Sequence, residues 1–124
     1  MRHLLWATIL LLLTPLASAE TYRISGKATY ADNSAVSLDY VYVNCEQGAY
    51  ECYQYRGTEA MTNAYGEFTV VIDVGSEEDG IDILLTLKGE NFTHTIDLAK
   101  HQNSPEDKVY QNLKLQQTPT SSGV

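Results

Sequence analysis

The chain has 124 residues, of which 8 are basic and 16 acidic, so its formal net charge at pH 7 is −8. This balance argues against nucleic acid and anionic lipid surfaces as partners, because both select positive side chains that displace counterions. Nine tyrosines against two phenylalanines and one tryptophan favour β-strands and amphipathic surfaces, where tyrosine is common.

The first nineteen residues have the pattern of a secretory signal peptide. Arg2 opens a short positive start, and an almost unbroken apolar run covers residues 4–13. Ala17 and Ala19 supply the small residues that signal peptidase requires, so we expect the mature chain to begin at Glu20. The run is too short to span a bilayer comfortably, and an uncleaved anchor is the alternative interpretation. We therefore expect a secreted, periplasmic or cell-surface protein without a membrane span in the mature chain.

The remaining sequence predicts one domain at residues 20–115 and a disordered polar tail at residues 116–124. Cleavage of the signal peptide would remove Arg2. The mature chain would then have seven basic and sixteen acidic residues, a formal charge of about −9.

Apolar and polar residues alternate through this domain with the period of two that is typical of β-strands. Turn signals separate the runs, and Ser104 with Pro105 predicts one helical turn before the last strand. The pattern predicts an all-β fold, a seven-strand immunoglobulin-like or prealbumin-like two-sheet sandwich. The expected strands are 22–30, 41–45, 52–61, 68–72, 81–87, 92–98 and 109–115. The expected core consists of Ile24, Val41, Val43, Phe68, Val70, Ile72, Ile83, Leu85 and Leu87.

Cys45 and Cys52 are the two cysteines of the chain. In a chain sent to an oxidising compartment a disulfide is the first interpretation, here between neighbouring strands of a hairpin. A zinc site is the alternative, but its further ligands, His94 and His101, lie far along the sequence. The spacing also differs from that of redox-active CxxC motifs.

Two motifs resemble a known family. They are Ile-Ser-Gly-Lys-Ala at residues 24–28 and Thr-Asn-Ala-Tyr-Gly-Glu-Phe at residues 62–68. In this order they resemble the carboxypeptidase regulatory-like domain, a transthyretin-like seven-strand sandwich related to Cna-B modules, over roughly residues 22–88. The resemblance implies a non-enzymatic structural or binding module, although the Tyr-rich segment 50–55 departs from the family's shorter connection. In the second motif, Gly66 should supply a positive φ and Asn63 should bond the turn's backbone.

Catalysis by a nucleophile requires a Ser or Cys beside an oriented histidine. The domain offers only His94, which the parity of its strand places inward, and His101, which we expect to be solvated in a polar loop. The string Tyr-Arg-Gly-Thr at 55–58 is similar to the C-terminal tail of hydroxyisourate hydrolases, which are transthyretin relatives, but here it is mid-chain. We therefore expect no enzyme, with a transthyretin-type hydrolase as the weakest alternative.

The acidic loop after residue 72 is a candidate calcium site, and calcium is the one cofactor that the sequence suggests. Carboxylates and loop carbonyls are the ligands that calcium prefers, but the spacing is not that of an EF-hand. A solvated acidic turn is the competing interpretation. The candidate ligands are Asp73, Glu77, Glu78, Asp79 and Asp82.

The tyrosines predict a binding face. If Val41 and Val43 point inward, Tyr40 and Tyr42 line the outer face of the sheet, and we expect Tyr53 and Tyr55 to join them. Exposed tyrosines contact proteins and sugars, although ordinary cross-strand pairing also explains them.

These observations predict a secreted or surface-associated non-catalytic module with a structural or adhesive role, whose partner is a protein or a glycan. A small-ligand or calcium-binding domain is the first alternative. Asn91 begins the only Asn-x-Ser/Thr triplet, which predicts a glycosylation site at a turn in organisms that glycosylate exported proteins.

Overall fold

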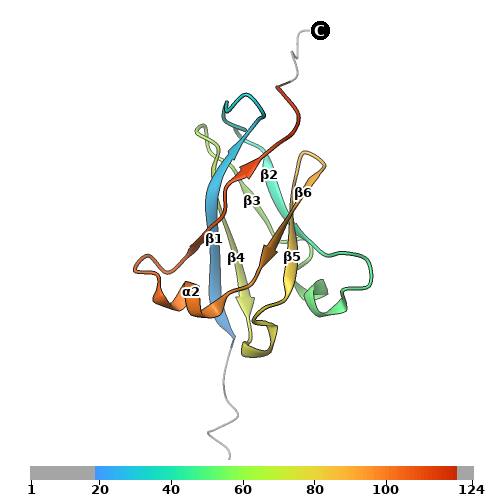
Figure 1. Cartoon of the computed structure of the whole chain (residues 1–124), viewed down its shortest axis with the longest axis vertical. Coiled ribbons are helices and arrows are strands. Elements are labelled where there is room, and N and C mark those ends of the chain that lie inside the picture. The colour runs from blue at the N-terminus through green and yellow to red at the C-terminus, as the bar shows by residue number, and fades with distance from the viewer. Residues whose placement is uncertain (1–18, 120–124) are drawn as a thin grey trace, which may run out of the picture.

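Two four-stranded β-sheets form the fold in the computed structural model, which describes residues 19–119 (Figure 1). We call them the β1 sheet and the β2 sheet. The β1 sheet contains β4 (Glu67–Val74), β1 (Glu20–Thr29), β7 (Val109–Tyr110) and β8 (Leu113–Lys114). The β2 sheet contains β3 (Glu59–Met61), β2 (Tyr40–Asn44), β5 (Asp82–Leu87) and β6 (Glu90–Thr95). The all-β, two-sheet prediction is confirmed, with the expected last strand divided into β7 and β8.

The core lies between the two sheets and follows strand parity. All nine residues predicted for it are buried. In β4 every second side chain points inward, and in β2 Val41 and Val43 are buried while Tyr40 and Tyr42 are exposed. The predicted register of β2 is therefore confirmed.

Gly26 allows the C-terminal segment to cross the long strand β1. β1 pairs antiparallel with β4 and parallel with β7 and β8. Between β7 and β8, the carbonyl oxygen of Gln111 would lie 1.9 Å from a Cβ atom at Gly26. Only glycine permits this approach, which gives the glycine of the first motif a structural role.

The predicted turn before β4 is also confirmed. Gly66 has a φ of 81°, and a Cβ atom there would lie 2.4 Å from the carbonyl oxygen of Ala28. The Asn63 Oδ1 atom accepts the amide protons of Tyr65 at 2.9 Å and Glu67 at 3.0 Å. The side chain thus fixes the turn that leads Phe68 into the core.

The expected strand 52–61 is wrong in its first half. The chain instead forms a 3-10 helix, η1 (Tyr50–Tyr55), before β3. The Val43 amide bonds the carbonyl of Thr58, and a hairpin in this register would place Cys45 opposite Arg56. A bridge from Cys45 to Cys52 is therefore incompatible with a straight hairpin, and coiling the chain brings Cys52 back to the end of β2.

Residues 104–107, predicted as one helical turn, form a turn in which the Asp107 amide donates to the Ser104 carbonyl at 3.2 Å, and a helix that was not predicted precedes them. Helix α2 (Leu98–Asn103) begins after Asp97, whose side chain accepts the Lys100 amide proton at 3.0 Å, and it ends at Ser104. The expected strand 92–98 accordingly stops at Thr95. A second 3-10 helix, η2 (Ser76–Glu78), occupies the acidic loop. Over residues 19–119, no helix has the length and apolar character needed to cross a membrane.

The two ends of the domain differ from the prediction in how far the described structure tests them. The signal peptide lies outside the described residues except for Ala19, and Glu20 is the first residue of β1. Gln116 and Gln117, which we assigned to the polar tail, donate their amides to the Glu90 carboxylate at 2.8 and 3.2 Å. The folded domain therefore extends past residue 115, while residues 120–124 lie outside the described part.

Candidate binding surface

Two tyrosines stand side by side on the outer face of the β2 sheet. The ring centroids of Tyr40 and Tyr42 are 6.0 Å apart, and the rings are tilted by 35°. Alternate residues of β2 point to opposite faces, so burial of Val41 and Val43 leaves these tyrosines outside. They are 38% and 40% exposed. Both side chains are therefore partly covered and partly open to solvent.

Met61 extends this surface onto the neighbouring strand β3. It is paired with Tyr40 and is 48% exposed. We call Tyr40, Tyr42 and Met61 the tyrosine patch. Leu38, just before β2, adds a further exposed apolar side chain. Large apolar groups gathered on a monomer's surface commonly mark an interaction site.

Polar groups surround the tyrosine patch. Tyr42 is paired with Glu59 on one side and Thr86 on the other. The Lys88 ammonium lies 3.2 Å from the Asp39 carboxylate, and this hydrogen bond raises the pKa of Lys88. An amphipathic centre with a polar border is the arrangement found in protein interfaces.

Asn91, the predicted glycosylation site, lies on the same face. Thr86 pairs with Tyr42 in one direction and with Asn91 in the other, and its hydroxyl donates to the Asn91 Oδ1 atom at 2.7 Å. Asn91 is exposed. A glycan attached there would border the tyrosine patch.

Tyr53 and Tyr55 do not join the patch, which corrects the prediction. Both lie in η1, where the chain coils instead of continuing the sheet. The buried Tyr55 donates its hydroxyl proton to Glu78 at 3.0 Å, and burial raises its pKa to about 12. Tyr53 belongs to a separate group, with Tyr50 at 5.2 Å and the Arg56 guanidinium at 4.0 Å from its ring.

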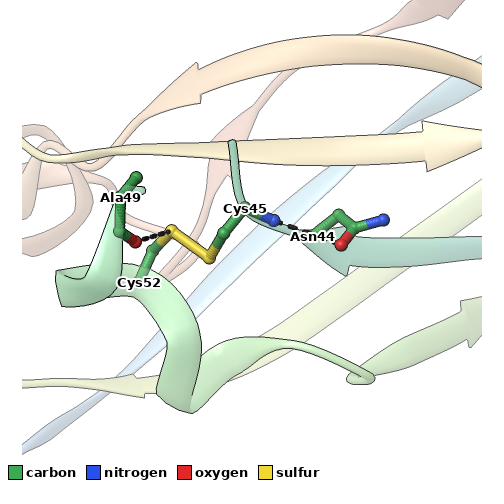
Figure 2. The surroundings of a disulfide bond; sticks show 4 residues. All are labelled: Asn44, Cys45, Ala49 and Cys52. Carbon is green, nitrogen blue, oxygen red and sulfur yellow. Dashed lines mark hydrogen bonds between the residues drawn. A yellow bond between two sulfur atoms is a disulfide. The ribbon is translucent and has the colours of Figure 1, made fainter. Parts of the chain in front are cut away.

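The disulfide between Cys45 and Cys52 holds η1 against the end of β2 (Figure 2). The two Cα atoms are 6.0 Å apart, within the predicted limit for a bridge. Cys45 follows β2 directly, and Cys52 is buried in η1, three residues after Ala49. The bridge is confirmed, but it joins a strand end to a helix and not two hairpin strands.

The acidic loop does not gather the predicted calcium ligands. Asp79 accepts the Leu98 amide proton at 2.9 Å, and Asp82 accepts the Thr95 hydroxyl proton at 2.5 Å. Asp73 lies in β4, and the Glu77 carboxylate accepts a proton from the Ser76 hydroxyl at 3.5 Å. Within residues 19–119 there is no group of three His, Cys, Asp or Glu side chains placed to hold a metal.

Glu78 connects η2 to η1. One of its oxygens accepts protons from the Gly75 amide, the Tyr55 hydroxyl and the Gln54 amide, each at 3.0 Å. The Gly75 amide is the largest of the causes that lower the pKa of Glu78. The carboxylate therefore stabilises the loop through this one oxygen.

His94 forms part of a hydrogen-bonded chain between the sheets. Its Nδ1 atom lies 2.6 Å from the Gln111 Oε1 atom, and its Nε2 atom lies 2.8 Å from the Tyr22 hydroxyl. The Gln111 amide nitrogen donates to the Thr93 carbonyl at 3.1 Å, which leaves Oε1 to accept a proton from Nδ1. Burial lowers the pKa of His94, and in the neutral ring the Nε2 atom accepts the Tyr22 hydroxyl proton.

His101 is buried, which corrects the expectation of a solvated loop. Its Nε2 atom accepts the Arg23 amide proton at 3.0 Å, and its ring stacks on Tyr22 at 4.9 Å. Helix α2, absent from the predicted elements, turns this side chain inward. Among the described residues, neither histidine hydrogen-bonds a Ser or Cys side chain.

Comparison of the chain with models of known families, with curated proteins and with solved structures finds no match. The family suggested by the two motifs therefore stays a prediction, and the functional argument depends on the surface itself.

Proposed function

We propose that this chain is an exported, non-catalytic β-sandwich module that attaches to a protein or glycan partner through the tyrosine patch. The observation that carries the proposal is the exposure of Tyr40, Tyr42 and Met61 together on one rigid sheet face. These side chains do not form part of the core, because the alternate, inward-facing residues of β2 fill it. Tyrosine supplies large amphipathic contact area with few rotatable bonds, and it is enriched among residues that dominate binding energy.

Export is supported by the leader and by the bridge. The sequence of residues 1–19 has the signal-peptide pattern, and a disulfide such as Cys45–Cys52 fits an extracellular location. The two motifs support membership of the carboxypeptidase regulatory-like group, with its transthyretin-like or immunoglobulin-like sandwich. The glycines of both motifs have the close backbone contacts that explain them.

A non-catalytic role is supported by the bonding of both histidines. A general base must have a nitrogen within hydrogen-bond reach of the nucleophile's proton. Here Tyr22 and Gln111 occupy both nitrogens of His94, and the Arg23 amide occupies the Nε2 atom of His101. In the Tyr-Arg-Gly-Thr string the Tyr55 hydroxyl is bonded to Glu78. These contacts favour a structural role for each residue that a hydrolase would use.

The test compares three variants for binding to a glycan array and to an array of extracellular proteins. Truncating a central interface tyrosine commonly costs about 2 kcal/mol, or about thirtyfold in Kd. We expect Tyr40→Ala and Tyr42→Ala to weaken by that factor whichever interaction the unmodified chain shows. Tyr65→Ala is the matched control, because Tyr65 is exposed on a turn. Binding that survives both patch substitutions, or no binding on either array, would contradict the proposal.

A further inference from the structure

Strand β4 is at one edge of the β1 sheet, and within residues 19–119 it pairs with β1 alone. An edge strand presents unpaired amides and carbonyls that attract another strand, and proteins usually protect such edges with proline, lysine, a bulge or a covering segment. The sequence of β4, Glu-Phe-Thr-Val-Val-Ile-Asp-Val, contains neither proline nor lysine. Its pairing with β1 is continuous from Lys27–Glu67 to Glu20–Val74, without a bulge.

The hydrogen bonds of β1 show which residues of β4 face outward. Even-numbered Ala28 donates its amide to Gly66, ahead of β4, whereas the carbonyls of Ser25 and Thr29 accept from the C-terminal segment. Even-numbered residues of β1 therefore face β4. Because Ile24 pairs with Val70, the even-numbered residues of β4 face β1, and its odd-numbered residues direct their backbone groups to the open edge.

Three of these outward residues lack backbone partners. Glu67 is occupied, because its amide and carbonyl both bond Asn63. For Thr69, Val71 and Asp73, no partner for either backbone group occurs among residues 19–119. Val71, at the centre, is 46% exposed. The middle of β4 thus offers three amides and three carbonyls in one row.

We propose that a second copy of this chain pairs antiparallel with β4 along this edge, with the two-fold axis at Val71. In that register Val71 faces Val71 of the other copy, and Thr69 faces Asp73. Each facing pair exchanges two hydrogen bonds, so the row is satisfied on both copies. Closed two-fold symmetry is the commonest form of homo-oligomer.

The side chains of β4 suit this self-pairing. The apolar Val71 side chains meet at the axis, and each Asp73 carboxylate lies beside a Thr69 hydroxyl instead of another acid. Glu67 would face Gly75, so no like charges are directly opposite. An acidic strand from another protein, paired at the same edge, would place its carboxylates opposite Glu67 and Asp73. The self-paired register avoids such repulsion.

The formal charge of about −9 on each mature copy opposes the association, and salt screens such repulsion. The contact is also small compared with stable interfaces. We therefore expect a weak dimer that is strengthened by salt. It would carry two tyrosine patches, each on the outer face of a β2 sheet, so its avidity for a surface would exceed that of one copy.

Cysteine substitution tests the register directly. The native cysteines are bridged, so Val71→Cys adds one free thiol. Directly facing Cα atoms lie about 5.5 Å apart, within the range for a disulfide, so the oxidised Val71→Cys variant should become a covalent dimer. Asp73→Cys is the matched control, because two copies of residue 73 would be roughly 13 Å apart. It should cross-link only when mixed with Thr69→Cys.

Sedimentation equilibrium of the unmodified mature chain provides the second measurement. Up to about 1 mM protein and at high salt, we expect a dimer fraction that Val71→Lys removes without changing the melting temperature, since that side chain lies outside the core. A strictly monomeric chain under these conditions would overturn the proposal. So would equal cross-linking of Val71→Cys and Asp73→Cys. If both dimer tests fail and another protein binds the β4 edge, the edge serves that partner and the proposed dimer is wrong.

Discussion

Tyr22 of β1 and His94 of β6 are joined by a hydrogen bond of 2.8 Å that crosses from one sheet to the other. The Tyr22 oxygen also accepts the Asp97 amide proton at 3.1 Å, and Gln111 holds the far side of the His94 ring. Every polar atom in this buried group has a partner. Satisfied buried networks of this kind fix one arrangement of the surrounding core.

Replacing Tyr22 with Phe should test the strength of this connection. The ring would keep its stacking on His101, but the His94 Nε2 atom and the Asp97 amide would lose their partner. Leaving buried polar groups unpaired costs about 1–3 kcal/mol, so we expect a loss of that size in the free energy of unfolding, measured with urea. Tyr42→Phe is the control and should change it by less than about 0.5 kcal/mol. Equal losses in the two variants would contradict the role given to the buried hydroxyl.

The same group predicts a pH dependence of stability. Burial lowers the pKa of His94 below its usual 6.5, so the unfolded chain binds this proton at a higher pH than the folded chain does. The free energy of unfolding should therefore be constant above that value and fall as the pH decreases through it. The pKa values of Glu78 and Glu90 are also lowered, from a usual 4.5. Protonation of these carboxylates therefore decreases the free energy of unfolding only at a lower pH than protonation of His94 does.

Urea unfolding at about pH 7.5 and about pH 5.5 measures the effect. The decrease in unfolding free energy should be smaller in His94→Gln than in the unmodified chain, because glutamine does not titrate. His101→Gln serves as the comparison for loss of a buried imidazole. If His94→Gln kept the whole pH dependence, the proton would bind elsewhere.

Strand parity made the core predictable, because a period of two places alternate residues on opposite faces whatever the topology. The outward position of Tyr40 and Tyr42 followed from the same rule. The path of η1 could not be predicted from this rule, because it depends on two constraints from separate parts of the chain. The pairing of Val43 with Thr58 sets the register, and the bridge at Cys45 then forces the intervening residues to coil.

The buried histidines show a second limit. Ile96 and Leu98 have the alternation of a strand, so the short helix α2 was not expected and His101 was placed in solvent. Tyr22 and His94 are 72 residues apart, and no local pattern indicates that they meet. The open edge of β4 was equally hidden, because alternation shows which side chains face outward but not which strand is last in a sheet.

Calcium should not affect stability. One of the two Glu78 carboxylate oxygens already accepts three hydrogen bonds, Asp79 and Asp82 bond different segments, and residues 19–119 contain no group of three candidate ligands placed to hold a metal. A ligand that binds only the folded chain must raise the melting temperature. We therefore expect about 5 mM calcium to leave that temperature unchanged in scanning calorimetry. An increase of several degrees, lost in Asp79→Asn with Asp82→Asn, would establish the calcium site instead.

Removing the Phe68 side chain should strongly destabilise the sandwich. It is buried, is paired with Gly26 across β1 and β4, and fills the space above that glycine, where no side chain is present. Phe68→Ala would lose its burial and leave a cavity, which costs about 3–5 kcal/mol, a large share of the stability of a domain this small. Tyr42→Ala should cost far less, because the ring is half exposed on the opposite face. Chemical denaturation of both variants measures the difference, and similar losses would mean that the tyrosine patch contributes to folding as much as the core does.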